Sequence, residues 1–299
     1  MALKLAYETW GEGAHPLLLV HGFTGNRTSF DHLRSSWSPH VKAIVVELPG
    51  HGQTPLPTRP GREGFLETLD ALYAVLDELN VARTNLLGYS QGARFALAAV
   101  MRRPERFTRL IMESGSPGLH RRQHRTERRV KDSELALFLR QKGLTAFMDY
   151  WESLPLFAGL QRLPEEMRVA LRARRLANTA EGLAGALECL GLGVQPDYWP
   201  ELQRQRLPTL LLTGALDEKF TLTARRMAEE LPVVYRRAFE GCTHAPHLEV
   251  PEEFAQEVLS FIRTPWYESP EFESTGADAS PAPIATVEPS LSKKSQPTP

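Results

Sequence analysis

Gly88-Tyr89-Ser90-Gln91-Gly92 places a serine between two glycines. The short apolar run 84–87 comes before this pentapeptide and the helix-like run 93–102 follows it, so the serine lies at a strand-to-helix turn. The side chain at the tip of such a sharp turn crowds its neighbours, and flanking glycines relieve that crowding. The pattern is typical of a nucleophile elbow, in which the serine hydroxyl is exposed at the top of a sheet.

The rest of the chain alternates between strands and helices. Five short apolar runs, each followed by Gly or Pro, indicate buried parallel strands at 17–20, 43–46, 84–87, 109–112 and 209–212. Segments with helical periodicity lie between several of these runs, and this alternation favours a doubly wound sheet. The stretch 233–239 is expected to form the last strand, and 251–262 a closing helix.

One region breaks this alternation. Residues 120–205 contain almost no strand-like run and are rich in Leu, Ala, Arg and Glu. We expect a helical cap inserted over the carboxyl edge of the sheet, where open α/β sheets bind ligands. Residues 1–119 and 206–264 then form the core. In residues 265–299, Pro, Ser, Thr and Ala dominate, so we expect a disordered tail that the chemistry does not need, with a docking segment as the alternative.

The composition is that of an ordinary globular protein. The chain has 299 residues, of which 42% are hydrophobic and 24% charged, with a net charge of −1. Such a small charge gives no global attraction to nucleic acid or to anionic membranes. No apolar run approaches the ~18 residues of a membrane span, and the N-terminus meets charge too early for a signal peptide. Cys189 and Cys242 form no spacing motif and are expected to be buried thiols, so we expect a cytoplasmic enzyme.

The elbow serine needs two partners. A serine hydroxyl requires a histidine to take its proton and an acid to orient that histidine. In the α/β-hydrolase fold the chain order is Ser, then Asp or Glu, then His. Asp217 follows the run 209–212 and His244 follows the expected last strand, so Ser90, Asp217 and His244 have this order. The sequence therefore predicts a catalytic triad on an α/β-hydrolase fold, with a mostly parallel sheet flanked by helices. His247 is the alternative base, and His244 is preferred because it lies nearer the strand end.

Two backbone N–H groups are expected to form an oxyanion hole, which stabilises developing negative charge. One belongs to Gln91, directly after the serine. The other is expected from Phe23, in the loop after the first buried strand, where Gly22 allows a close approach. His21 in the same loop is expected to be structural.

An arginine follows the serine by one helical turn. Residues at i and i+4 share a helix face, so the Arg94 guanidinium can lie beside the Ser90 hydroxyl. This favours an anionic substrate, with a buried salt bridge as the alternative. The cap holds two more arginine clusters, at 121–129 and 168–175. One or two arginines of each are expected to face the site, since guanidinium binds carboxylates in bidentate fashion.

With these residues the chain resembles the 2-succinyl-6-hydroxy-2,4-cyclohexadiene-1-carboxylate synthases of menaquinone biosynthesis, from about residue 3 to 263. Two of the matching stretches, His21-Gly22-Phe23 and 48–52, occur in many α/β-hydrolases. The more diagnostic ones are Ser90 with Arg94, Ser116-Pro117-Gly118-Leu119 and Gln195-Pro196. The resemblance also includes 114–115, Asp197 with Trp199, 217–220, and His244 with His247-Leu248-Glu249.

The resemblance implies a carbon–oxygen lyase that eliminates pyruvate from 2-succinyl-5-enolpyruvyl-6-hydroxy-3-cyclohexene-1-carboxylate. It implies a small polycarboxylate substrate and no metal or cofactor. Ser90, deprotonated by His244, would act as a base on a ring C–H and not as an acyl nucleophile. The substrate-binding residues implied are Tyr89, Arg94, Arg128 and Arg172.

The sequence departs from the family pattern at three places. Gln91-Gly92-Ala93 stands where Met-Gly-Gly is expected, and Glu47 stands where Asp is expected. In the histidine loop, Thr243-His244-Ala245-Pro246-His247 replaces Gly-His-Asn-Ala-His, a change expected to shift the base loop and affect substrate choice. Two other functions stay open: a carboxylesterase or C–C bond hydrolase for an acidic substrate, and a non-catalytic ligand-binding protein of the same fold. Oligomeric state is not predicted.

Overall fold

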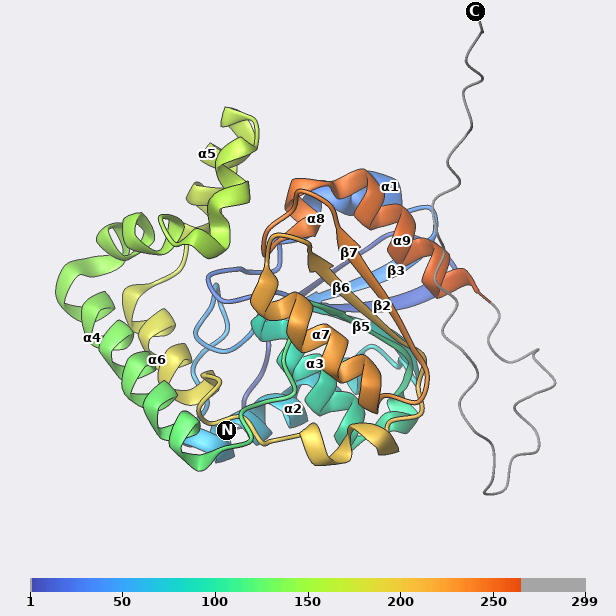
Figure 1. Ribbon diagram of the computed structural model, residues 1–299, viewed down its shortest axis with the longest axis horizontal. Helices are drawn as coiled ribbons and strands as arrows, with labels where there is room; N and C mark the ends of the chain where they lie inside the picture. The colour runs from blue at the N-terminus through green and yellow to red at the C-terminus, as the bar shows by residue number, and fades with distance from the viewer. Residues whose placement is uncertain (1, 265–299) are drawn as a thin grey trace, which may run out of the picture. The chain divides into compact units, whose positions relative to one another are not determined.

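The computed structural model describes residues 2–264, and the tail expected over 265–299 lies outside this range. A seven-stranded sheet forms the centre of the described chain (Figure 1). Its strands are β1 (Tyr7–Trp10), β2 (His15–Val20), β3 (Val41–Val46), β4 (Thr84–Tyr89), β5 (Phe107–Glu113), β6 (Thr209–Gly214) and β7 (Val234–Phe239). Only β1 runs antiparallel to its neighbour. The predicted mostly parallel sheet is confirmed.

The strand order β1-β3-β2-β4-β5-β6-β7 reverses direction between β2 and β4. The chain leaves β2 toward one edge of the sheet and later leaves β4 toward the other edge. Ligands of open α/β sheets bind outside the carboxyl ends of the strands at such a switch point. The loop that follows β2 carries Phe23, and the turn that follows β4 carries Ser90, so both lie at this point.

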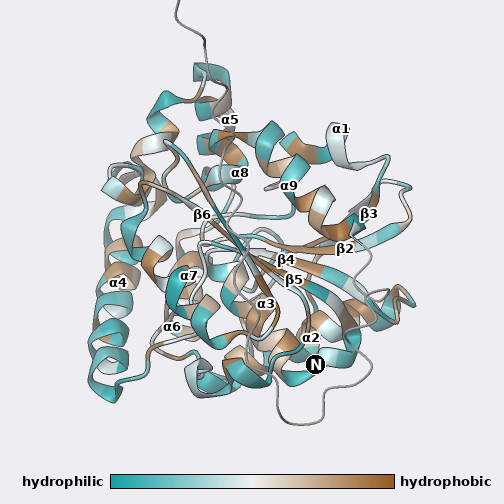
Figure 2. Cartoon of the chain, turned by 45° about the vertical axis from the view of Figure 1, so that its right-hand side comes forward, coloured by the Kyte–Doolittle hydropathy of each residue, from teal (hydrophilic) through white to brown (hydrophobic). Residues whose placement is uncertain are grey.

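Helices cover both faces of the sheet. One face carries α2 (Gly61–Glu78), α3 (Gln91–Arg102) and α7 (Glu218–Glu230), and the other carries α1 (Arg34–Trp37) and α9 (Pro251–Arg263) (Figure 1). Because both faces are covered, the central strands are nearly continuous apolar runs. The side chains of 17–20 are fully buried, and the central strands appear brown in Figure 2. The short elements η1 (Asp31–Leu33), η2 (Pro104–Arg106) and α8 (Pro246–Glu249) complete this part of the chain.

The chain between β5 and β6 forms helices. They are α4 (Arg122–Glu152), η3 (Pro155–Arg162), α5 (Glu165–Leu176), α6 (Ala180–Leu190) and η4 (Trp199–Arg204). In Figure 1 the helices α4, α5 and α6 lie beside the sheet and not on its faces. An apolar cluster that includes Leu139, Phe147 and Leu183 joins α4 to α6. Gly143 interrupts α4 with a φ of +80°, which divides it into two segments.

Two further expectations can be compared with the structure. Cys242 is buried, whereas Cys189 is only partly buried, and both are free thiols. The expectation of two buried thiols is therefore wrong for Cys189. Across residues 2–264, the structure contains no helix with the length and apolar character needed to span a membrane.

Candidate active site

Ser90 occupies a strained turn between β4 and α3. Its backbone has φ +50° and ψ −105°, a conformation that residues other than glycine rarely adopt. The two flanking glycines are needed because other backbone atoms approach them closely. A Cβ on Gly88 would lie 2.3 Å from the carbonyl oxygen of Gly92, and a Cβ on Gly92 would lie 2.0 Å from that of Val20. The turn therefore has the geometry expected of a nucleophile elbow.

Ser90, His244 and Asp217 form a hydrogen-bonded chain. The Ser90 hydroxyl lies 2.9 Å from His244 Nε2, and His244 Nδ1 lies 2.6 Å from Asp217 Oδ2. His244 and Asp217 are buried, whereas Ser90 is partly exposed. With the Nδ1 proton donated to the carboxylate, Nε2 is left as the acceptor for the serine proton. The structure thus brings together the three residues that the sequence singled out.

A loop anchored by Glu249 holds His244. The Glu249 carboxylate accepts hydrogen bonds from the Thr243 backbone N–H at 3.0 Å and from the Thr243 hydroxyl at 2.7 Å. The Thr243 hydroxyl in turn accepts a hydrogen bond from the Gly159 backbone at 3.2 Å. Arg162 of η3 completes the cluster, 3.2 Å from Glu249. Thr243, which departs from the family pattern, therefore anchors the base loop, and sequence reasoning did not assign this role to Glu249.

His247 contacts Glu113, whereas the histidine that bonds Ser90 is His244. The Glu113 Oε1 atom lies 2.8 Å from His247 Nδ1 and accepts the His247 backbone N–H at 3.0 Å. Both side chains are fully buried. Burial lowers the pKa of His247 to about 3 and raises the pKa of Glu113 well above its usual range. The pair is therefore held uncharged, and its geometry favours His244 over His247 as the base.

Aromatic rings surround the His244 imidazole. The rings of Phe220, Tyr89 and Phe157 lie 4.7, 5.5 and 5.9 Å from it, measured between centroids. The Tyr89 ring also contacts the His247 ring, at 4.5 Å between centroids. These rings limit the access of water to the buried end of the triad.

The loop after β2 lies directly against the elbow. A Cβ on Gly22 would lie 2.6 Å from the Tyr89 ring and 3.4 Å from Ser90 Cβ, so glycine permits this approach. The next residue is Phe23, whose backbone N–H makes no hydrogen bond to any other residue within 2–264. Gln91 begins α3, where a backbone N–H has no partner inside the helix. Both expected oxyanion-hole donors are thus available beside Ser90.

His21 joins two loops below the site. Its Nδ1 donates to the Gly22 carbonyl at 2.7 Å, and its Nε2 accepts the Leu48 backbone N–H at 3.0 Å. Burial, reinforced by nearby His51, lowers the pKa of His21 well below its usual value. The neutral imidazole therefore connects the two loops, in agreement with the structural role expected from the sequence.

Arg94 is buried without a carboxylate partner. Only 8% of it is exposed, and its Nη1 donates to Gln195 Oε1 at 3.3 Å. Gln195 is itself held by the Ser116 carbonyl, 3.1 Å from its Nε2. Burial, with a contribution from the charge of Arg128, lowers the pKa of Arg94 to about 9. The salt bridge that the sequence left as an alternative is absent from the described residues, and the guanidinium can receive an anion.

Arg128 binds Asp132, the carboxylate whose charge also acts on Arg94. Its Nε donates to Asp132 Oδ1 at 2.8 Å, within one turn of α4. Burial raises the pKa of Asp132, whereas the charges of Arg128 and Arg94 oppose that rise. Two guanidinium groups therefore face one carboxylate, which leaves a net positive charge near the elbow.

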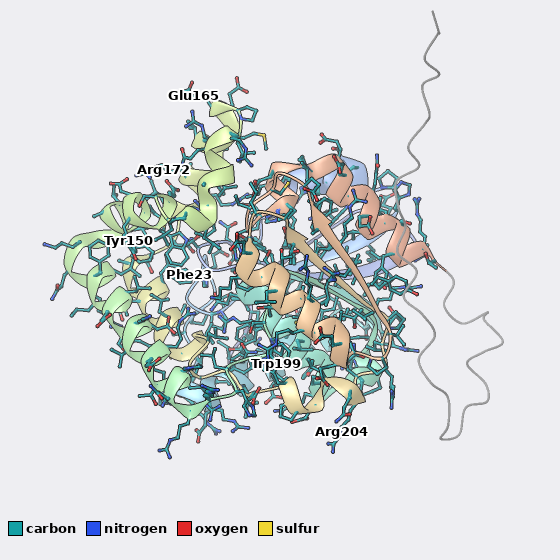
Figure 3. All side chains as sticks on the ribbon, viewed as in Figure 1. Phe23, Tyr150, Glu165, Arg172, Trp199 and Arg204 are labelled. Carbon is teal, nitrogen blue, oxygen red and sulfur yellow. The ribbon has the colours of Figure 1, made fainter. Side chains whose placement is uncertain are left out.

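Arg172 does not lie with these groups. Its guanidinium forms ion pairs with Asp149 at 2.5 Å and Glu152 at 2.6 Å, where α5 meets α4, and the side chain is 33% exposed. Figure 3 labels it on α5.

Arg175, one turn further along α5, is only 7% exposed. It lies 5.5 Å above the Phe157 ring, next to His244, and shares Glu152 at 3.0 Å. The structure thus favours Arg175 as the arginine that α5 directs toward the triad.

Sequence reasoning also missed an aromatic contact between cap and core. Phe23 lies between the sheet and the helices α4 and α6 (Figure 3). Its ring centroid is 5.3 Å from that of Trp151 and 6.2 Å from that of Phe147. The Trp151 indole nitrogen is buried without a hydrogen-bond partner in the described chain. The sequence spacing of the aromatic residues in α4 did not predict this contact, because it is the same as that of aromatic residues that only pack in a core.

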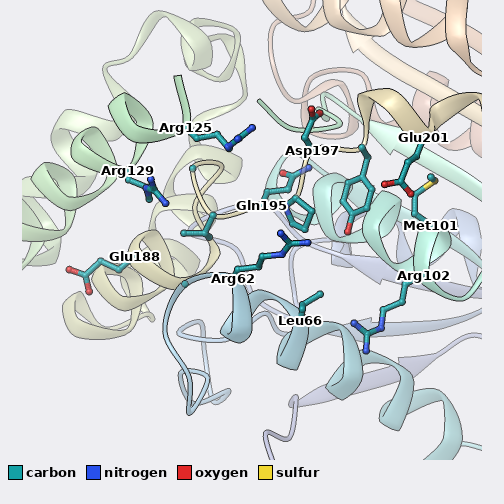
Figure 4. Close-up of a pocket in the computed structure, with 15 residues that line it drawn as sticks. Arg62, Leu66, Met101, Arg102, Arg125, Arg129, Glu188, Gln195, Asp197 and Glu201 are labelled. Carbon is teal, nitrogen blue, oxygen red and sulfur yellow. The ribbon is translucent and has the colours of Figure 1, made fainter. Parts of the chain in front are cut away.

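Gln195 lines a large cavity that does not include the triad. It measures about 770 Å³, and its lining includes Arg62, Arg125, Arg129 and Tyr198 (Figure 4). It contains none of the triad residues. Its connection with the site is indirect, through Gln195, whose side chain bonds Arg94. Cavity size alone therefore does not mark the catalytic centre in this fold.

Relatives of the chain identify its family. A family model described as alpha/beta hydrolase fold matches residues 15–251. A putative 2-succinyl-6-hydroxy-2,4-cyclohexadiene-1-carboxylate synthase from Bacillus subtilis (strain 168) is 35% identical over 246 residues, which cover 82% of this chain and 89% of that protein. The chain belongs to the 2-succinyl-6-hydroxy-2,4-cyclohexadiene-1-carboxylate synthase family.

A second synthase, MenH and an esterase are also similar to this chain. The synthase from Salmonella agona (strain SL483) is 31% identical over 252 residues, which cover 84% of this chain and 95% of that protein. The solved structure of MenH from S. aureus has a TM-score of 0.81 and 31% identity, and covers 86% of this chain and 97% of that one. A thermophilic esterase from Thermogutta terrifontis, with malate bound, has a TM-score of 0.72 and 26% identity, over 87% of this chain and 93% of that one. The resemblance stated from the sequence is confirmed.

Proposed function

We propose that the protein is the lyase of menaquinone biosynthesis that converts 2-succinyl-5-enolpyruvyl-6-hydroxy-3-cyclohexene-1-carboxylate into 2-succinyl-6-hydroxy-2,4-cyclohexadiene-1-carboxylate and pyruvate. Membership of the synthase family supports this reaction. The observation that carries it is Arg94, a buried guanidinium one helical turn from Ser90 with no carboxylate partner in the described chain. A site for a neutral ester has no need for such a group.

The reaction follows from the positions of the double bonds in the substrate and in the product. The ring carbon C2 carries the succinyl ketone, so its C–H is acidic. Removal of that proton moves electrons into a new C2=C3 bond, shifts the C3=C4 double bond to C4=C5, and breaks the bond from C5 to the enolpyruvyl oxygen. The leaving group becomes pyruvate after it takes up a proton.

In this proposal Ser90 is the base that removes the C2 proton. His244 takes the hydroxyl proton through Nε2, and Asp217 stabilises the imidazolium that forms. Negative charge then develops on the succinyl ketone oxygen. In the proposal the backbone N–H groups of Phe23 and Gln91 stabilise it, an electrostatic contribution that is worth several kcal/mol in oxyanion holes of other enzymes.

The substrate has three carboxylates, and the proposed binding groups are three arginines. Arg94 and Arg128 carry an excess of positive charge near the elbow. Arg175 takes the place that the sequence gave to Arg172, because Arg172 is neutralised by two carboxylates. Tyr89 lines the site beside His244. Residues 120–205 are proposed to act as the cap of a core formed by 1–119 and 206–264. A cytoplasmic location remains a prediction from the sequence.

Hydrolysis is the second candidate. The triad geometry suits acyl transfer equally well, and the esterase from Thermogutta terrifontis shares the fold. In that case Ser90 would attack a carbonyl. The third possibility, a non-catalytic ligand-binding protein, has no support in the geometry, since all three triad side chains are in hydrogen-bond contact.

A direct assay separates these functions. Pyruvate release from the enolpyruvyl substrate is followed with lactate dehydrogenase for the wild type, Ser90→Ala and Arg94→Ala, alongside hydrolysis of p-nitrophenyl acetate. The lyase proposal expects pyruvate from the wild type and a loss on the order of 10³-fold or more for Ser90→Ala. Arg94→Ala should harm the lyase reaction more than ester hydrolysis. Ester hydrolysis without pyruvate release would contradict the lyase proposal and support the hydrolase.

A further inference from the structure

A second cavity lies next to the catalytic histidine. It has a volume of about 710 Å³ and lies between the start of α4, the segment around Trp199, and one side of α7 along its length. Its lining includes Arg121, Trp199, Lys219, Phe220 and Arg226. We refer to the cavity formed by these residues as the basic vestibule.

The charges of the vestibule are unbalanced. Arg121, Lys219 and Arg226 form no ion pair with any residue in 2–264, and all three are exposed. Glu230 is the one carboxylate among the residues that line this cavity. His120, at the rim, is bound to Asp197 at 2.8 Å. The vestibule therefore attracts anions.

Aromatic rings lie beneath the cations. The Arg226 guanidinium lies 4.8 Å from the centroid of the Trp199 ring, and the Lys219 ammonium lies 5.1 Å from that of the Phe220 ring. Such contacts hold each cation over a flat apolar surface. A cyclohexene ring that carries carboxylates can use both features, because its carboxylates meet the cations and its carbon skeleton meets the apolar surface, whereas a simple inorganic anion uses only the charge.

Phe220 connects the vestibule to the triad. Its ring lines the cavity and lies 4.7 Å from the His244 ring, and its backbone N–H donates to Asp217 Oδ1 at 3.2 Å. The charges of Arg128 and Asp217 both act on the Lys219 ammonium, and the charges of Arg128 and Asp132 both act on the Arg94 guanidinium. The cations of the vestibule and of the elbow are therefore coupled through Arg128.

We propose that the basic vestibule is the site where the polycarboxylate substrate is first captured, before it moves past Phe220 to Arg128 and Arg94. This inference rests on the proposed function for the identity of the substrate. Lys219 and Arg226 act on capture and not on the chemical step. Electrostatic steering of this kind raises association rates and weakens as ionic strength rises.

The test uses the full-length chain and two variants. Lys219→Gln and Arg226→Gln are combined in a double variant, and Arg225→Gln is the matched control, an exposed arginine on the same helix outside the vestibule. We expect the double variant to lower kcat/KM for the enolpyruvyl substrate about tenfold at low salt, with kcat within about twofold, and to flatten the dependence of kcat/KM on salt. Arg225→Gln should behave like the wild type.

A binding measurement distinguishes failure of the vestibule proposal from failure of the lyase proposal. Benzene-1,3,5-tricarboxylate is titrated into each protein by calorimetry, and we expect the double variant to weaken its binding about tenfold relative to Arg225→Gln. If the wild type releases pyruvate but the double variant matches Arg225→Gln in kinetics and binding, the vestibule proposal is wrong. If the wild type releases no pyruvate but the double variant loses tricarboxylate binding, the vestibule stands as an anion site and the lyase function fails.

Discussion

Glu249 holds Thr243, the residue before His244, through both its backbone N–H and its hydroxyl. The carboxylate is 4% exposed, so these charge-assisted hydrogen bonds form away from water. The histidine of the proposed triad is therefore positioned by a group five residues further along the chain. Glu249 itself makes no hydrogen bond to Ser90, His244 or Asp217.

Glu249→Gln should weaken both the fold and the reaction. An amide keeps the size of the carboxylate but loses its charge and one acceptor oxygen. We expect the free energy of unfolding to fall by about 2 kcal/mol and kcat to fall more than KM changes. Urea unfolding and steady-state kinetics measure the two effects. Glu240→Gln, a nearby exposed carboxylate, is the control. Unchanged kcat in a destabilised Glu249→Gln protein would mean that the hydrogen bonds from Thr243 to Glu249 have only a structural role.

His244→Ala and His247→Ala should fail in different ways. His244→Ala removes the group that takes the Ser90 hydroxyl proton, so kcat should fall on the order of 10³-fold, with little effect on folding. His247→Ala leaves Glu113 buried without its partner, so it should lower the free energy of unfolding by about 2–3 kcal/mol. Activity per folded molecule should then fall much less than in His244→Ala. A larger catalytic loss for His247→Ala would reverse the assignment of the base.

Arg175→Gln should reduce kcat/KM by roughly 10- to 100-fold, because a hydrogen bond to a charged group is worth about 1.5–3 kcal/mol. Arg172→Gln, three residues earlier on the same helix, should stay within about threefold of the wild type, since its guanidinium is already held by Asp149 and Glu152. Steady-state assays of pyruvate release compare the two variants. A larger loss of kcat/KM in Arg172→Gln than in Arg175→Gln would show that Arg172 is the arginine that binds substrate.

The Glu113–His247 pair should give a pH-dependent stability difference. Burial raises the pKa of Glu113 in the folded protein above its unfolded value, so the folded state binds more protons and loses stability as the pH rises above about 4.5. Glu113→Gln resembles the protonated acid and has no such loss. The free energy of unfolding of Glu113→Gln relative to the wild type should therefore increase from pH 5 to pH 8 in urea titrations. A difference that stays constant with pH would show that Glu113 is equally ionised in both states.

The sheet and the triad could be predicted from sequence because their signals are local. Each predicted central strand is a short apolar run followed by glycine or proline, and Ser90, Asp217 and His244 each follow the carboxyl end of a strand. Parallel strands bring such ends to one edge whatever the cap does. β1 was missed because its four residues, 7–10, form an edge strand paired antiparallel to β3 and lack an apolar run.

The cap could be predicted only as helical. The phase of α5 decides whether Arg172 or Arg175 faces the triad, and that phase depends on contacts with Glu152 and Phe157 from other elements. No pattern within 165–176 contains this information. The role of Thr243 was hidden for a similar reason, since its partners are Glu249 and Gly159. Long-range contacts between cap and core thus set the parts of the site that sequence reasoning did not resolve.

The hydrogen bond from Gly159 to Thr243 joins the cap to the loop that carries His244. Arg162, also in the cap, donates to Gly241 and Glu249 of the same loop region. The inserted helices and the histidine are therefore not independent modules. A chimera that exchanged caps between family members would need to keep η3 with its own histidine loop. Evolution of new substrate ranges through cap replacement faces the same coupling, so we expect 155–162 and 241–249 to be inherited together.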